Sequence, residues 1–176
     1  RISIILFNIY KNLRCSYCCY SDHYPQSVPF SNNYMKDDVA RQAVDFLYKH
    51  SRKTKSELTL GFYGGEPMIN FPMIRRTTNY ARDVFGDQIT FTMTTNATLL
   101  DQERIKFLIS NNFGLTISLD GDKNSTDRYR KYWKKKDSVL VILGKVHDLL
   151  SGGRNGSRNV WQLQCKGFGT HSRLSG

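Results

Sequence analysis

Three cysteines lie close together near the start of the chain, at Cys15, Cys18 and Cys19, and a fourth lies far away at Cys165. Cysteines grouped so tightly cannot form a ladder of disulfides along the chain, which favours a reducing compartment such as the cytoplasm, and metal chemistry. Cys-x-x-Cys is half of a zinc site, for which Cys15, Cys18, His23 and Cys165 could be the ligands, or a redox pair.

Three further polar segments each have a plain structural interpretation when taken singly. Gly64-Gly65-Glu66-Pro67 is typical of a turn in which Pro67 begins a helix and Glu66 lies near the helix N-terminal dipole. Asn96 and Asp120 tolerate turn geometry and often bond their own backbone, and Asp101 is typical of a residue that begins a helix. None of these segments identifies a binding site alone.

The apolar residues predict the elements that position these segments. Four short β-branched runs, at residues 2–7, 58–63, 89–95 and 115–119, predict strands, and residues 160–165 could form a fifth. Apolar residues at helical spacing predict four helices between and after the strands. The residues that mark these helices are Val39, Ala43, Phe46 and Leu47; Ile74, Ala81 and Phe85; Ile105, Leu108 and Ile109; and Val139, Leu143, Val146 and Leu150.

Alternating strands and helices predict an α/β fold of right-handed βαβ units around a parallel sheet, with strands covered on both faces. The carboxyl ends of parallel strands meet at one edge, where loops vary and helix N-termini point their N–H groups at ligands. Segments rich in functional side chains follow each of the four strands. We therefore expect all four to lie at the same edge of the sheet.

In this order on successive strands, the four segments resemble the radical S-adenosylmethionine (radical SAM) family, and especially its peptide-maturase (SPASM-type) branch. The residues that carry the resemblance are NLRCSYC, FYGGEP, TMTTNATLL and ISLDG with DRYR beyond it, and the resemblance covers about residues 2–150. It implies a partial TIM-like barrel, truncated here after about four βα units. The corresponding organisation is a partial core domain at residues 1–150 and a tail rich in Gly, Ser and Arg at 151–176, expected to be flexible or non-native.

The resemblance also implies a cluster site. In the family, a Cys-x-x-x-Cys-x-aromatic-Cys loop holds a [4Fe–4S] cluster, and Cys15 and Cys18 match its second and third cysteines. Tyr17 matches the aromatic position whose backbone meets the adenine of S-adenosylmethionine. The first cysteine position is occupied by Lys11, whose ammonium is a donor without a lone pair for iron. Cys19 is the one neighbouring thiol that could substitute for the missing ligand.

S-adenosylmethionine would bind at the ends of the remaining strands. The backbone of Gly64 and Gly65 would receive its amino group, Glu66 would supply negative charge, Asn96 and Ser118 would lie near the ribose, and Arg130 would pair with the carboxylate. Family members often have glycine where Ala97 stands, and alanine tolerates left-handed geometry poorly, so the resemblance implies a slightly altered third loop. Asp120 is the only candidate for a catalytic role. It could orient a substrate, or it could simply cap its own turn.

The activity that the resemblance implies is reductive cleavage of S-adenosylmethionine to a 5′-deoxyadenosyl radical, which then abstracts hydrogen from a peptide or protein substrate. The electron would come from a reductant such as flavodoxin or ferredoxin. Lys11 is expected to impair this activity. The first alternative is a non-catalytic remnant that binds cofactor or peptide.

The second alternative, a basic RNA-binding module, rests on charge. The net charge is +11, with 14 Lys and Arg against 11 Asp and Glu in residues 1–120, and 12 against 4 in residues 121–176. Only residues 128–136 interleave cations with aromatic residues, and a solvated loop explains them equally well, so nucleic acid is not favoured as a partner. The longest apolar run, at residues 4–7, is far shorter than a membrane span, and no membrane association is expected.

Overall fold

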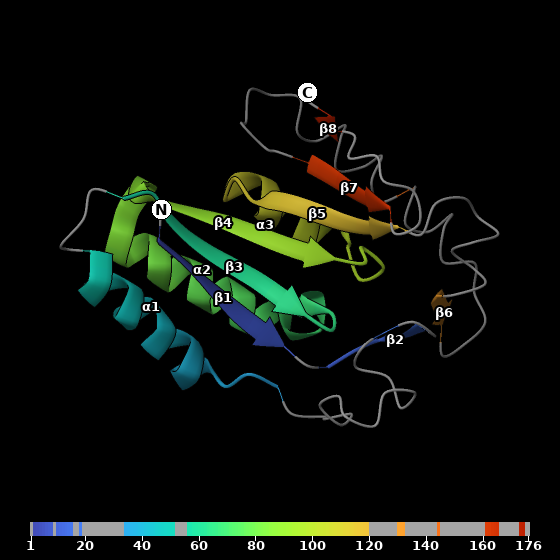
Figure 1. Cartoon of the computed structure of the whole chain (residues 1–176), viewed down its shortest axis with the longest axis horizontal. Helices are drawn as coiled ribbons and strands as arrows, with labels where there is room; N and C mark the ends of the chain where they lie inside the picture. The colour runs from blue at the N-terminus through green and yellow to red at the C-terminus, as the bar shows by residue number, and fades with distance from the viewer. Residues whose placement is uncertain are drawn as a thin grey trace.

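A six-stranded sheet organises the protein in the computed structural model, which describes residues 2–8, 10–15, 18, 34–51, 56–119, 130–132, 144, 161–165 and 173–174 (Figure 1). In spatial order its strands are β1 (Ile2–Asn8), β3 (Leu58–Gly64), β4 (Ile89–Thr95), β5 (Gly114–Leu119), β7 (Trp161–Cys165) and β8 (Arg173–Leu174). The first five run parallel, and β8 is antiparallel to β7. The four predicted strands, the fifth candidate and the α/β fold are confirmed.

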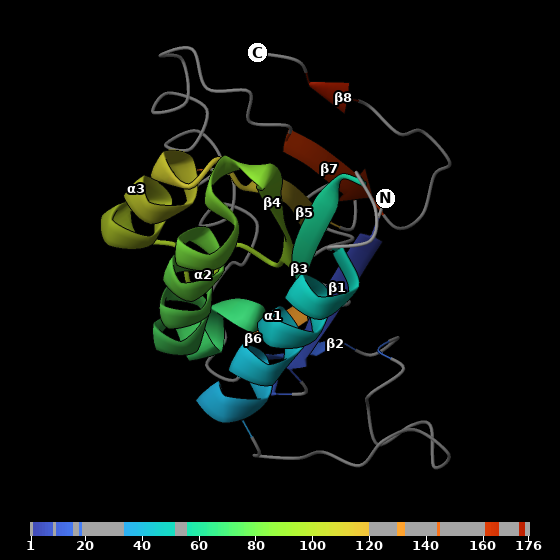
Figure 2. The same cartoon turned by 90° about the vertical axis from the view of Figure 1, so that its left-hand side faces the viewer.

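Helices cover one face of this sheet (Figure 2). They are α1 (Asp37–Ser51), α2 (Phe71–Phe85) and α3 (Gln102–Ser110), with the short 3-10 helices η1 (Pro67–Asn70) before α2 and η2 (Gly86–Gln88) after it. Acidic residues in the first turn of α1 and basic residues in its last turn complement the helix dipole. Three predicted helices are confirmed, and the fourth, at residues 139–150, lies outside the described residues except for Gly144, which is helical.

A second, two-stranded sheet lies beyond the carboxyl end of β1 (Figure 1). Its strands are β2 (Leu13–Cys15) and β6 (Arg130–Tyr132), which pair antiparallel. Leu13 is buried. This small sheet places part of the cysteine segment beside a segment that follows β5 by more than ten residues.

The core lies between the sheet and the helices. Phe62 of β3 and Phe91 of β4 both stack on Phe113, with ring centroids 5.9 and 5.2 Å apart. Burying side chains of this size stabilises the fold by roughly 1.5–3 kcal/mol each. Helix α1 contributes a stripe of Ala40, Val44 and Leu47 to the core.

The sequence predicted α1 correctly but not its buried face. Two residues that marked the helix, Val39 and Phe46, are 47% and 56% exposed. Ala43 is only partly buried, whereas Leu47 belongs to the core. The helix is rotated so that the stripe beginning at Ala40, rather than the one beginning at Val39, faces the sheet.

The expectation that both faces of the strands are apolar and covered is wrong for β4. Burial alternates along this strand: Phe91, Met93 and Thr95 are buried, whereas Thr90 is exposed and Thr92 is half-buried. Helices α1, α2 and α3 lie on one side of the sheet (Figure 2), and Arg82 of α2 lies over the Phe91 ring on that side. Within the described part of the chain, these three helices leave the opposite side of the sheet uncovered. That opposite face carries threonines, which suits the inner wall of an open barrel.

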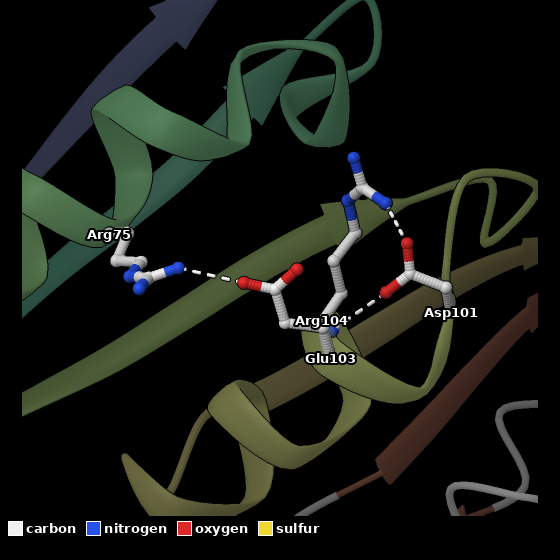
Figure 3. A network of polar contacts seen from close by, with 4 residues as sticks. All are labelled: Arg75, Asp101, Glu103 and Arg104. Atoms are coloured by element: carbon white, nitrogen blue, oxygen red, sulfur yellow. Dashed lines mark hydrogen bonds and ion pairs between the residues drawn. The ribbon is translucent and has the colours of Figure 1, made fainter.

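The start of α3 fixes the length of the loop after β4. The Asp101 carboxylate accepts a hydrogen bond from the Arg104 backbone N–H at 2.9 Å and also pairs with the Arg104 side chain (Figure 3). Asp101 therefore begins the helix, as its residue type predicted. The Arg75–Glu103 pair, at 2.7 Å, joins α2 to α3, but both side chains are more than half exposed, so it adds little stability (Figure 3).

Among the described residues, no helix combines the length and the apolar character that crossing a membrane would require.

Candidate functional site

The segments that follow β1, β3 and β4 meet at the carboxyl edge of the sheet. They are named here the cysteine loop (residues 10–18), the Gly64 loop (residues 64–67) and the Asn96 loop (residues 96–101). Direct hydrogen bonds join the three loops to one another. The prediction that these segments lie at one edge is confirmed.

Glu66 holds the Gly64 loop against the other two loops. Its carboxylate is fully buried and accepts hydrogen bonds from Thr95 Oγ1 at 2.7 Å and from the Met68 N–H at 3.1 Å on Oε1. On Oε2 it accepts a third from the Asn96 N–H at 2.8 Å. The Glu66 N–H in turn donates to the Tyr10 carbonyl at 2.8 Å. Hydrogen bonds to an ionised carboxylate are stronger than neutral ones, so Glu66 is a firm link between loops.

The plain interpretation of the Gly64 loop is also confirmed. Glu66 caps η1, which begins at Pro67. Gly64 has a φ of 122°, a conformation that side-chain-bearing residues rarely adopt, and it pairs with Asn8 in the β1–β3 register. Gly64 and Gly65 are half-buried. That their backbone receives the cofactor's amino group, and that Glu66 supplies charge to it, stay predictions.

The Asn96 side chain is engaged within the chain. Its Oδ1 accepts from the Thr98 N–H at 3.0 Å, which is the bond to its own backbone that the residue type predicted, and from Thr98 Oγ1 at 2.6 Å. Its Nδ2 donates to Asn12 Oδ1 at 2.9 Å. Ala97 has a φ of 60° and is fully buried, so this alanine adopts the left-handed backbone that glycine favours.

The cysteine loop presents thiols at two of the three expected cluster positions. Cys15 and Cys18 are half-buried, neither forms a disulfide, and the Cys18 N–H donates to the Cys15 carbonyl at 3.1 Å in a tight turn. The remaining position, the first in the motif, is occupied by Lys11, which is also half-buried. Three irons of a [4Fe–4S] cluster each need a thiolate ligand, whereas this chain offers two thiols and one lysine side chain at the three positions. Lys11 is therefore the residue at which this site differs from the cluster site of the family.

Other ligand sets are not tested. Within the part of the chain that the structure describes, no group of three His, Cys, Asp or Glu side chains could hold a metal ion. The substitute thiol Cys19 and the zinc candidate His23 lie outside the described residues, and for Cys165 only the strand is described. The zinc site and the rescue by Cys19 therefore stay predictions.

The structure describes two of the remaining four predicted site residues and leaves the other two outside the described part of the chain. Ser118 is half-buried near the end of β5. Arg130 lies in β6 directly opposite Cys15 of β2, which brings its backbone to the cysteine loop. Tyr17 and Asp120 lie outside the described residues.

Three polar residues that sequence reasoning did not single out join these loops. Asn12 and Thr98 bond each other and Asn96, and Thr95 Oγ1 donates to Glu66 and accepts from the Ala97 N–H at 3.0 Å. The clustering of Thr95, Asn96 and Thr98 just after a strand was the available signal. Asn12 had no signal of its own, because its partners lie more than 80 residues away.

A pocket of about 170 Å³ opens on the sheet face that carries the threonines. Gly61 leaves its floor open, since a Cβ there would lie 3.2 Å from Thr92 Oγ1. The pocket is lined by Ile5, Gly61, Phe62, Tyr63, Thr92, Met93, Thr94 and Thr116. A volume of this size suits one side chain or a similar small group.

Comparison with known proteins agrees with this arrangement. The sequence model of the Radical SAM superfamily matches residues 12–157. The chain is 30% identical over 138 residues to a cysteine-type anaerobic sulfatase-maturating enzyme of Clostridium novyi, an alignment that covers 77% of this chain and 36% of that enzyme.

Two solved structures share the fold. Native anSMEcpe with bound AdoMet matches with a TM-score of 0.76 and 24% identity, covering 93% of this chain and 44% of that one. Native anSMEcpe with bound AdoMet and the Kp18Cys peptide matches with a TM-score of 0.74 and 23% identity, covering 93% and 42%. The chain thus spans less than half the length of these relatives.

The match to the superfamily extends over most of the chain, and the same segments that meet at the carboxyl edge of the sheet lie within it or just before it. The protein therefore belongs to the radical SAM superfamily, whose members use a [4Fe–4S] cluster and S-adenosylmethionine.

Proposed function

We propose that this chain is the core part of a radical SAM enzyme that modifies a peptide or protein, and that Lys11 impairs its ability to assemble the cluster. The observation that carries the proposal is the joining of three loops at one sheet edge, with the cysteine loop bonded to both of its neighbours. Radical chemistry of this kind needs the cluster and S-adenosylmethionine side by side. Loops tied together in this way would provide that arrangement.

The chemistry that the bound group supplies in the family is one-electron cleavage of S-adenosylmethionine to a radical that abstracts hydrogen. The protein's own residues would bind and orient. The missing side chains of Gly64 and Gly65 permit close approach of the methionine amine. Glu66 adds negative charge nearby, and Arg130 can offer two parallel N–H groups to the methionine carboxylate.

Peptide or protein is the proposed substrate class. The relative from Clostridium novyi is a sulfatase-maturating enzyme, and one of the two matching structures holds a peptide. The pocket over Gly61 supports this choice, because its volume suits a single side chain. The electron would come from a protein reductant such as flavodoxin or ferredoxin.

Lys11→Cys tests the proposal. The chain and the variant would be reconstituted anaerobically with iron and sulfide, and iron content, visible absorption and formation of 5′-deoxyadenosine would be measured. We expect about a severalfold or larger rise in iron content for Lys11→Cys, because a third thiolate completes the donor set. Lys36→Cys is the matched control, since it also exchanges a lysine for a cysteine, at an exposed position before α1.

The outcomes separate three cases. A cluster and cleavage in Lys11→Cys alone would support an enzyme impaired at one ligand. Equal iron in the chain and in both variants would mean that another ligand, such as Cys19, completes the site, which would overturn the impairment. No cluster in any of the three would favour the non-catalytic remnant.

A further inference from the structure

Three side chains from two loops form a closed ring of hydrogen bonds at the candidate site. Asn12 Nδ2 donates to Thr98 Oγ1 at 2.8 Å, Thr98 Oγ1 donates to Asn96 Oδ1 at 2.6 Å, and Asn96 Nδ2 donates to Asn12 Oδ1 at 2.9 Å. Each side chain donates once and accepts once within the ring. Thr98 and Asn96 are only 5% and 8% exposed, so water competes little for these bonds.

The ring joins residues that the family chemistry must hold together. Asn12 follows the first cluster position, Lys11, and precedes Cys15 by three residues. Asn96 bonds Glu66 through its backbone N–H, and the Glu66 N–H returns to the Tyr10 carbonyl of the cysteine loop. Two routes therefore join the cysteine loop to the Asn96 loop, one through Asn12 and the other through Glu66 and Tyr10. Any shift of one loop relative to the other must break a hydrogen bond on at least one of these routes.

We propose that Asn12 is a positioning residue, which sets the place of the cysteine loop relative to the Asn96 and Gly64 loops and, once Lys11→Cys supplies the third cluster ligand, the place of the cluster relative to S-adenosylmethionine. This inference rests on the proposed function. Asn12 itself is not proposed to touch cofactor or substrate. It acts through Asn96 and Thr98.

The first test needs no cluster. Alkylation rates of Cys15 and Cys18 would be measured by peptide mapping in the chain as it stands and in Asn12→Ala, Thr98→Val and Thr98→Ser. Loss of the ring should open the cysteine loop locally and raise both rates about tenfold in Asn12→Ala and Thr98→Val. Thr98→Ser keeps the hydroxyl and should restore the rates to within about twofold of the parent.

Two controls separate loop opening from loss of the fold. Asn111→Ala removes another half-buried asparagine side chain, whose Nδ2 donates to the Phe107 carbonyl at the end of α3, and it should leave both alkylation rates unchanged. Amide hydrogen exchange in α2 should stay slow in every variant. Unchanged alkylation in Asn12→Ala would overturn the inference whatever the enzyme does.

The second test uses the reconstituted Lys11→Cys protein. In that background, Asn12→Ala should retain the parent's iron content but bind S-adenosylmethionine about tenfold more weakly, with an altered electron paramagnetic resonance signal of the reduced cluster on addition of the cofactor. Thr98→Val should do the same, and the double variant should be no worse than Asn12→Ala, because both act through one ring. A merely structural ring would leave cofactor affinity and signal unchanged.

The two failures are distinguishable. If Lys11→Cys assembles no cluster, the proposed function fails, and the cofactor part of this inference fails with it. If the cluster assembles and the cofactor is cleaved, but Asn12→Ala binds S-adenosylmethionine as tightly as its parent, the proposed function stands and the positioning role of Asn12 is overturned.

Discussion

Cys15 lies directly opposite Arg130 in the antiparallel pairing of β2 with β6. The two residues are more than a hundred positions apart in the sequence, one in the cysteine loop and the other beyond β5. The small sheet thus brings a cation-bearing segment to the loop whose thiols are proposed to bind the cluster. Arg130 as the partner of the methionine carboxylate stays a prediction, and the pairing places the Arg130 backbone at the cysteine loop.

Arg130→Lys in the Lys11→Cys background should weaken S-adenosylmethionine binding about tenfold while leaving iron content unchanged. Lysine keeps the positive charge but cannot present the two parallel N–H groups of a guanidinium. The loss of cofactor affinity therefore reports the paired hydrogen bonds rather than the charge. Equilibrium binding of the cofactor to the reconstituted protein would measure it. Lys131→Ala, which removes the adjacent cation of the same strand, should have a smaller effect. If Arg130→Lys bound the cofactor as tightly as its parent while Lys131→Ala bound it more weakly, only net charge would matter.

Glu66→Gln should lower the free energy of unfolding by about 1–3 kcal/mol. The carboxylate oxygens of Glu66 accept from Thr95, Met68 and Asn96, whereas glutamine must turn an NH₂ group toward at least one of these donors. Urea unfolding of the apo chain would measure the change. Glu57→Gln is the control, because Glu57 is exposed at the start of β3, and its stability should be unchanged. Similar stability in both variants would show that the buried carboxylate is not a link between loops.

Glycine should have opposite effects at two fully buried alanines. Ala97 has a φ of 60°, and a side chain in left-handed backbone costs roughly 1–2 kcal/mol, so Ala97→Gly should raise stability by up to about 1 kcal/mol after the added freedom of the unfolded chain is subtracted. Ala81 lies inside α2, where the same change should lower stability by about 1 kcal/mol or more. Chemical denaturation of both variants would measure the change in the free energy of unfolding. A loss of stability in both would mean that the loss of the buried methyl group outweighs backbone strain at Ala97.

Much of the local structure follows from short-range rules that the sequence displays. Pro67 and Asp101 begin helices because of their residue types. The ordering of the polar segments at one edge is also a consequence of sequence, because alternating strands and helices build a parallel sheet whose carboxyl ends coincide. The candidate site could therefore be located without the structure.

Other features depend on which surfaces meet, and periodicity does not encode that. In α1, the stripes beginning at Val39 and at Ala40 are both compatible with a helix, and only packing against the sheet and α2 selects the second. In β4, threonines at 90, 92 and 94 alternate with apolar residues, which indicates one less buried face but not which neighbouring elements cover the other face. Whether each face is buried or exposed depends on neighbours that come from elsewhere in the chain.

The fold class, the order of the loops and the departure at Lys11 follow from residue types along single segments of the chain. The folded arrangement was needed to show that Asn12 closes a ring with Asn96 and Thr98, that Glu66 bonds three groups of its own chain, and that Cys15 faces Arg130. Except for the Glu66–Met68 and Asn96–Thr98 bonds, these relationships join residues 29 to more than 100 positions apart. Hydrogen bonds act over about 3 Å of space, so such partners become visible only when the chain is folded.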